Sequence, residues 1–257
     1  MIWLQRGLLV LTLIFAAATM WIAVEIRGVP MPEEFDLPNG FETPILAMEF
    51  PRSFDDLRFI RSPANEPMRE HIEGVQAWDN YFPYAYAGLL LSFSTVLLVR
   101  LGTQSSFRWT PILLVGVTCG LIAYGIIRAD LRENDLINEV VHLVDHNAGL
   151  LRSMSRSLLP GINEAAWFKW SAIAYLVGFI SAFFAFARFR VLAALAIVPV
   201  AATLYARFIA PSGPAIEFMA QAIAVFFLAI PVLAVYFLLQ SFRRTEPENE
   251  SPRQVET

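Results

Sequence analysis

Three acidic side chains stand at the ends of two neighbouring apolar runs, where they could bind a polar group at a membrane surface. Asp79 comes just before the run at residues 81–99, and Asp130 and Glu133 follow the run at residues 111–127. A short polar turn joins the two runs, which predicts an antiparallel helical hairpin with all three carboxyl groups at one end. We therefore expect Asp79 to approach Asp130, directly or through one shared partner.

The expected acidic group needs a positive partner or a proton, because carboxylates that meet in a partly dry place repel one another. Glu133 and Asn134 follow Asp130 by three and four residues, so the three side chains share one helix face. Candidate partners for the carboxylates are Lys169, Arg52 or a bound cation. Two interpretations stay open: a salt-bridged clasp that ties spans together, and a binding or catalytic site.

Lys169 is the only lysine of the chain and lies between Trp167 and Trp170. Such a position is typical of an interfacial anchor, whose ammonium group extends outward to lipid headgroups. A lysine that completes the acidic cluster would point into the bundle instead. We expect this inward pose, because the clustered carboxylates need a counter-charge.

Two histidines, His142 and His146, are four residues apart, the spacing at which two imidazoles on one helix face can hold zinc. Glu139 and Asp145 lie nearby, and His71 could approach from an earlier segment. A zinc ion with an open coordination position would support a hydrolase that acts on lipid-like substrates. The other interpretation is a pair of surface histidines in a charged stretch, since short motifs often match by chance.

Composition and the remaining motifs narrow the class of protein. Hydrophobic residues make up 56% of the chain and the mean hydropathy is +0.53, both typical of a membrane protein. The net charge of −4 argues against a nucleic-acid partner. The single cysteine, Cys119, excludes a disulfide framework, and the chain has no G-x-S-x-G, glycine-rich phosphate-loop or C-x-x-C-H motif. Zinc is therefore the one cofactor that the sequence suggests.

Six apolar runs are long enough to cross a membrane as helices. They predict an all-α, polytopic membrane helix bundle that forms a single domain over residues 1–239. The first run also suits the apolar region of a signal peptide, but it continues past the small residues at 16–18, so we expect a retained anchor. The expected spans lie at residues 8–24, 81–99, 111–127, 167–187, 191–209 and 216–239.

The first of two long polar segments, residues 25–80, should form helices outside the membrane. Ser53 and Asp56 predict a capping box at the start of a short helix. These helices could pack on the bundle as surface elements or form a lid in the lipid interface. A second helix should be amphipathic, with an apolar face that holds Met68, Ile72 and Val75.

The second polar segment, residues 128–166, should be helical at its start and interrupted at residues 160–161, where proline precedes glycine. The last stretch, residues 240–257, is charged and contains proline, which predicts a disordered cytoplasmic tail.

Arginine placement predicts the orientation of the chain in the membrane. Arginines near span ends crowd the short loops and both termini on one side, whereas the two long acidic segments lie on the other. The excess of positive charge marks the cytoplasmic side. We therefore expect both termini to be cytoplasmic. The arginines are Arg6, Arg100, Arg108, Arg188, Arg190, Arg243 and Arg244.

The middles of the expected spans carry no ionisable side chain. Charges inside a membrane are costly and mark ion pathways and proton relays. Their absence from the sequence here counts against an ion pump or a proton-coupled carrier. Any polar chemistry should take place at the outer leaflet, where the acidic side chains stand.

Four short strings stand out in the chain: ILAMEF at residues 45–50, DNYFPYAY at 79–86, DLREN at 130–134 and KW at 169–170. Together they resemble a family of bacterial polytopic integral membrane proteins of unknown function, which in this chain implies a bacterial inner membrane protein. The matching pattern is a ΦΦxΦE(L/F) stretch, then D-x-x-F-x-x-x-Y, D-x-x-E-N and K-W, and it covers about residues 45–185. The resemblance implies a shared helical fold and a shared polar cluster of Glu49, Asp79, Tyr86, Asp130, Glu133, Asn134 and Lys169.

Two functions fit the sequence. The first is a non-catalytic integral membrane protein, either a subunit or a binder of a small ligand or lipid, with its polar cluster at the outer leaflet. The second is the metal-assisted hydrolase. In both cases the expected partners are the lipid bilayer and other membrane protein subunits.

Overall fold

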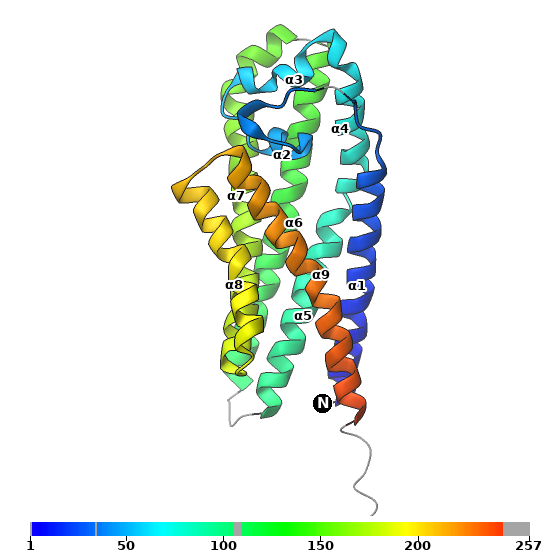
Figure 1. Cartoon of the computed structure of the whole chain (residues 1–257), viewed down its shortest axis with the longest axis vertical. Helices are drawn as coiled ribbons and strands as arrows, with labels where there is room; N and C mark the ends of the chain where they lie inside the picture. The colour runs from blue at the N-terminus through cyan, green and yellow to red at the C-terminus, as the bar shows by residue number, and fades with distance from the viewer. Residues whose placement is uncertain (1, 34, 105–108, 147, 244–257) are drawn as a thin grey trace, which may run out of the picture.

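The computed structural model describes residues 2–33, 35–104, 109–146 and 148–243, and every regular element within these ranges is helical (Figure 1). Six of the helices are long and apolar enough to cross a membrane, which confirms the predicted all-α bundle. They are α1 (Ile2–Gly28), α5 (Phe82–Gln104), α6 (Trp109–His146), α7 (Ala148–Phe186), α8 (Arg190–Leu204) with its π-helical continuation η4 (Tyr205–Ile209), and α9 (Gly213–Arg243).

The long helices pack in a simple order. Helix α1 lies along α5, α5 along α6, α6 along α7, and α7 along α8. Helix α9 crosses the bundle obliquely, from α8 near one end to α1 near the other (Figure 1). The start of α1 and the end of α9 therefore lie at the same end of the bundle, as an even number of crossings requires.

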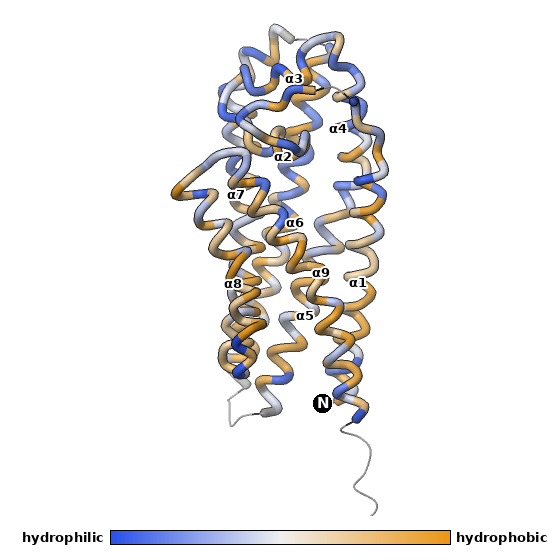
Figure 2. Tube along the Cα trace, viewed as in Figure 1, coloured by the Kyte–Doolittle hydropathy of each residue, from blue (hydrophilic) through white to orange (hydrophobic). Residues whose placement is uncertain are grey.

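A cap of short helices covers the opposite end of the bundle (Figure 1). We call residues 38–79 the cap. It carries much of the hydrophilic sequence, whereas the bundle beneath it is mainly hydrophobic (Figure 2). Its elements are η1 (Pro38–Gly40), α2 (Pro44–Glu49), η2 (Phe54–Leu57), α3 (Arg58–Arg61), η3 (Pro63–Asn65) and α4 (Glu66–Asp79).

Two predictions for the cap are confirmed. The Asp56 carboxylate accepts the backbone N–H of Ser53 at 2.9 Å, as the capping box requires. In α4 the apolar face is buried, and it holds Met68, Ile72 and Val75.

The predicted interruption at residues 160–161 is wrong, because α7 runs unbroken through Pro160. Tertiary packing offsets the backbone hydrogen bond that proline cannot make. A Cβ on Gly161 would lie 3.2 Å from the Leu136 side chain of α6, so the two helices approach closely at this point. Residues 128–166 are therefore extensions of α6 and α7 beyond the apolar spans. They bury Leu151, Leu158, Leu159 and Ile162.

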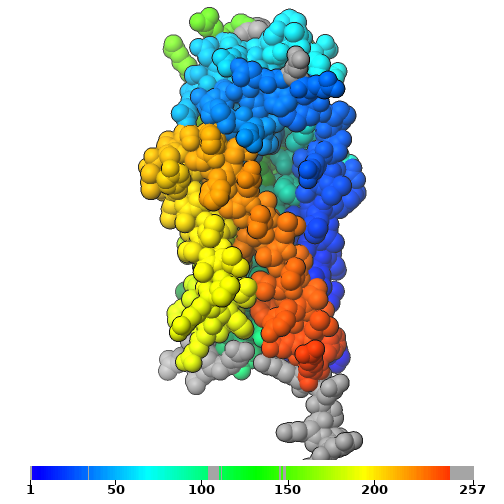
Figure 3. Space-filling view, viewed as in Figure 1, coloured from blue at the N-terminus to red at the C-terminus, as the bar shows by residue number. Residues whose placement is uncertain are grey.

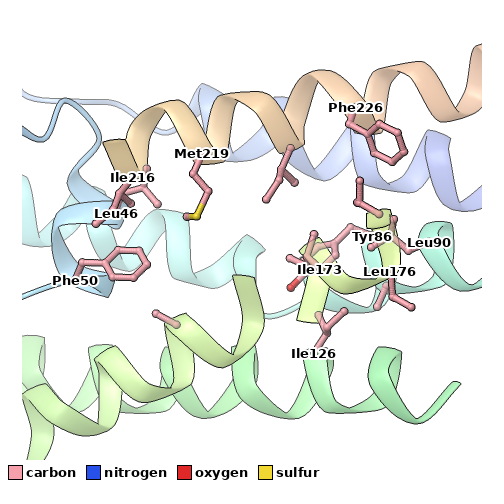
Figure 4. Packing of buried hydrophobic residues seen from close by; sticks show 14 of the residues in the cluster. Leu46, Phe50, Tyr86, Leu90, Ile126, Ile173, Leu176, Ile216, Met219 and Phe226 are labelled. Atoms are coloured by element: carbon pink, nitrogen blue, oxygen red, sulfur yellow. The ribbon is translucent and has the colours of Figure 1, made fainter. Parts of the chain in front are cut away.

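One hydrophobic core runs from the bundle into the cap. Figure 4 shows Leu46 and Phe50 of the cap facing Ile216 and Met219 of α9. Around the outside, many large apolar side chains are exposed, such as Leu121 of α6. A surface of this kind fits contact with lipid tails rather than water. The chain is a multi-pass membrane protein by these criteria.

Candidate ligand-binding site

Lys169 lies at the centre of a buried polar cluster beneath the cap. Its Nζ atom is 2.8 Å from Asp130 Oδ1, 2.8 Å from Glu133 Oε2 and 3.1 Å from Glu49 Oε1. Only 5% of the residue is exposed. The ammonium group forms salt bridges with all three carboxylates and donates hydrogen bonds to Asp130 and Glu49. Lys169 thus points into the bundle, as its sequence position among carboxylates predicts.

Two aromatic side chains hold the carboxylates from the other side. The Tyr86 hydroxyl of α5 donates to Asp130 Oδ2 at 2.6 Å, and the Trp170 indole of α7 donates to Glu49 Oε2 at 2.8 Å. Because Glu49 ends α2 of the cap, the cluster joins the cap to α5, α6 and α7. These contacts have the form of the salt-bridged clasp, one of the two interpretations that the sequence leaves open.

Asp79 lies at the edge of this cluster and is only half-buried. It forms no salt bridge within the part of the chain that the structure describes. Burial, and next the negative charge of Asp130, raise the pKa of Asp79 to about 7, although Lys169 and a hydrogen bond from Asn134 oppose the rise. The neighbouring Asn80 accepts a long hydrogen bond of 3.5 Å from Asn134. Asp79 is thus the carboxylate best placed to meet a proton or a cation from outside the cluster.

The cluster holds more negative than positive charge. Four carboxylates surround one ammonium group, which leaves a formal excess of three negative charges. Arg52, a predicted partner, does not join them: its side chain is exposed and its backbone N–H donates to Asp56 at 2.7 Å. Both carboxylate oxygens of Glu133 are buried with no hydrogen-bond partner among the described residues, although Oε2 lies 2.8 Å from Lys169 Nζ. Bound protons or a cationic group must therefore offset part of the charge.

A cavity of about 370 Å³ opens onto the cluster. Figure 3 shows a hollow directly below the cap, between α1 and α9. The polar lining includes Glu49, Asp79, Tyr86, Asp130 and Lys169. Its apolar walls are formed by Ile26, Ile45, Leu46, Val75, Phe82, Ile173, Ala220, Ile223, Ala224 and Phe227.

The cavity exists because α1 and α9 meet only toward the end of the bundle away from the cap. There the Arg6 guanidinium donates to the Ser241 hydroxyl at 3.2 Å and to the Ser241 carbonyl at 2.9 Å. Near the cap the two helices diverge (Figure 1). On α9 the wall of the gap carries small side chains four residues apart, Ala220 and Ala224.

Glu217 fixes the roof of the cavity, a role that sequence reasoning missed. Its Oε1 atom accepts the backbone N–H groups of Glu42 at 3.0 Å and Thr43 at 2.8 Å, and its Oε2 atom accepts the Thr43 hydroxyl at 2.9 Å. At the start of the same helix, a Cβ on Gly213 would lie 2.5 Å from the Asn39 carbonyl oxygen, so only glycine fits. The signal available in the sequence was a lone acidic residue in the first turns of an apolar helix.

The histidines lie apart from this cluster. The rings of His142 and His146 stack with centroids 4.2 Å apart, and His146 Nδ1 is 3.0 Å from the His142 carbonyl oxygen. His71 Nδ1 instead lies 2.8 Å from the Pro30 carbonyl oxygen. Over the described ranges, no three His, Cys, Asp or Glu side chains form a group that could hold a metal ion. Among the described residues, the structure thus brings no third zinc ligand to His142 and His146.

The chain matches no protein-family model, no curated protein and no solved structure. The family resemblance that the four sequence strings suggest therefore stays a prediction. What the structure adds is that all seven residues named by that resemblance lie at or beside one cluster.

Proposed function

We propose that this protein is a non-catalytic membrane protein that binds a lipid or another small amphiphile in the cavity between α1 and α9. The observation that carries the proposal is the position of the cavity, which joins a gap in the bundle wall to a buried charged cluster. Its volume lies in the range of small-molecule sites, which are mostly apolar with a few polar groups that fix orientation.

The walls suit an alkyl chain. Most of the lining side chains are aliphatic or aromatic, and those of α1 and α9 flank the gap. An alkyl chain that enters the cavity from the surrounding lipid exchanges one apolar environment for another, so its entry through the gap costs little free energy. The polar end of such a ligand would then lie beneath the cap, beside Asp79.

The charge of the cluster selects the polar end of the ligand. The Lys169 ammonium group already forms salt bridges with three carboxylates, so its charge is engaged within the cluster. Asp79, by contrast, faces the cavity without an ionic partner among the described residues. A headgroup with an ammonium or hydroxyl donor would bind there, whereas a phosphate would meet excess negative charge.

The same cluster also serves as the clasp between the cap and the bundle. We propose that the cap lies on the outer face of a bacterial inner membrane with both termini in the cytoplasm, since arginines crowd the opposite end. To test this orientation, single cysteines at Ser53 and at Thr103, each in a Cys119→Ala background, would be exposed to an impermeant maleimide. Ser53→Cys should react in intact cells and Thr103→Cys should not; the reverse pattern would overturn the orientation.

The binding proposal is tested with three single-chain amphiphiles that share one alkyl chain and end in an amine, an alcohol or a phosphate. Purified protein in nanodiscs should bind the amine most tightly and the phosphate most weakly, as read by competition or native mass spectrometry. Ala224→Phe should block binding because residue 224 lines the gap. Ala229→Phe is the matched control, an exposed alanine of the same helix outside the cavity. Equal binding of all three amphiphiles, or equal loss in both variants, would contradict the proposal.

A further inference from the structure

A second hollow lies on another side of α7, between α7 and α8, and the cavity beneath the cap does not reach it. Its volume is about 460 Å³. Along α7 the lining carries Ala174, Gly178 and Ala182, spaced by four residues so that they follow one helix face. A Cβ on Gly178 would meet only the Val200 side chain at 3.7 Å, an ordinary contact. The hollow is therefore a groove created by small side chains, and we call it the α7/α8 groove.

The length of the groove matches one lipid chain. Its lining on α7 begins at Ser171 and ends at Ala182, which corresponds to about 16 Å along a helix at 1.5 Å per residue. The hydrocarbon core of a bilayer is about 30 Å thick, so the groove is as long as one leaflet is deep. Exposed aromatic side chains border it, including Tyr175 and Phe208.

One positive charge stands at the cap-side end of the groove. Arg207 lies in the π-helical turn η4, and its Nη1 atom donates to the Ser171 hydroxyl. Ser171 follows Lys169 by two residues, so the guanidinium lies near the depth of the polar cluster. The ring of Trp167, 5.8 Å away, also fits the headgroup level, where tryptophan is enriched.

Arg207 has no acidic partner in the part of the chain that the structure describes, and its side chain is exposed. A guanidinium group binds phosphate through two parallel N–H donors, and Arg207 still has donors free beyond the one that Ser171 accepts. An apolar groove of leaflet depth that ends at an arginine is complementary to a phospholipid in both shape and charge.

We propose that the α7/α8 groove binds one anionic diacyl phospholipid from the leaflet nearest the cap. The phosphate contacts Arg207, and one acyl chain lies along the small side chains of α7. This site is separate from the cavity between α1 and α9 and has the opposite charge preference. Its test therefore does not depend on the function proposed above.

The experiment compares lipids that stay bound when the protein is released from nanodiscs into native mass spectrometry. The nanodiscs contain equal amounts of phosphatidylglycerol and phosphatidylcholine with the same acyl chains. The wild type should retain one phosphatidylglycerol in preference to phosphatidylcholine. Arg207→Gln should lower that preference roughly ten-fold, the factor expected from losing one charge-assisted contact. Arg190→Gln, at the other end of α8, should leave it unchanged.

Two further variants keep the test decisive if Arg207→Gln folds poorly, which melting in lipid-free detergent will reveal. Gly178→Leu and Ala182→Leu fill the groove without touching Arg207, and both should reduce retention of the lipid. The proposal would be overturned if the wild type showed no preference for phosphatidylglycerol, or if Arg190→Gln and Arg207→Gln had equal effects. It would also be overturned if Gly178→Leu and Ala182→Leu retained the lipid as the wild type does. Displacement of the lipid by inorganic phosphate would overturn it as well, because it would show a site for free phosphate.

Discussion

Replacing Lys169 by methionine removes the one positive charge that, among the residues the structure describes, contacts the carboxylates of the cluster. Glu49, Asp130 and Glu133 each lie within 3.1 Å of its Nζ atom, and all three are at least 95% buried. Loss of one partner from a buried ion pair costs about 3–5 kcal/mol, because the other charge stays buried and uncompensated. The side chain is almost fully buried, so water cannot replace the lost ammonium group.

The expected change is large enough to measure by melting. If each kcal/mol lowers the melting temperature by about 2–4 °C, Lys169→Met should melt roughly 6–20 °C below the wild type. The assay is thermal unfolding in one detergent, followed by intrinsic tryptophan fluorescence. Arg190→Met is the matched control, since Arg190 is exposed and should change stability by less than about 0.5 kcal/mol.

A second substitution separates charge from packing in this experiment. Glu133→Gln removes one of the three negative charges that contact Lys169, so it should recover part of the stability lost in Lys169→Met. The coupling between the two substitutions then measures the ion pair itself. If Lys169→Met melts like the wild type, the ammonium group does not hold the cluster together, and protons must offset its charge.

Three other predictions follow from single contacts. Burial raises the pKa of Asp79 to about 7 from an ordinary value of 3.8. Protonated Asp79 therefore favours the folded state at low pH, and this stability is lost as the pH rises through about 7. Wild type should melt lower at pH 8 than at pH 5, and Asp79→Asn should reduce that difference; an unchanged slope would refute the assignment. Glu217→Ala should speed amide hydrogen exchange at residues 41–50, where it holds two backbone N–H groups, and leave α6 unchanged. Joint replacement of His142 and His146 by alanine should leave both the zinc content and the melting temperature unchanged, because the pair has no third ligand among the described residues.

The spans and the inward lysine could be predicted because each depends on one strong local signal. A membrane-spanning segment is recognised from its own hydropathy. A lone lysine that lies near several carboxylates has its lowest energy when its ammonium group contacts them. The approach of Asp79 to Asp130 also follows from the tight hairpin, and both side chains line the same cavity. Glu49 was named only by the resemblance, since a helix as short as α2 has too few residues to show periodicity.

The missed features depend on how helices cross, which no local pattern encodes. Pro160 predicts a break in the helix, but packing of α7 on α6 at Gly161 keeps α7 continuous. The gap between α1 and α9 arises because α9 crosses the bundle obliquely, so that it approaches α1 at one end of the bundle and diverges from it near the cap (Figure 1). Glu217 acts as a clamp only because that path brings its carboxylate to the backbone of Thr43.

The position of the cavity gives a reason for the uncompensated charge at Asp79, one of the four carboxylates of the cluster. A purely structural clasp is most stable when its charges are matched, because each uncompensated buried charge lowers stability. Here Lys169 contacts three carboxylates, and the fourth, Asp79, lines the cavity without a salt bridge among the described residues. An unmatched carboxylate at the mouth of a cavity is what a site for a donor headgroup requires. It also predicts that such a ligand should raise the melting temperature more at pH 8, where Asp79 is ionised, than at pH 5, and Asp79→Asn should abolish this difference. Equal stabilisation at both pH values would mean that the ligand does not bind through Asp79.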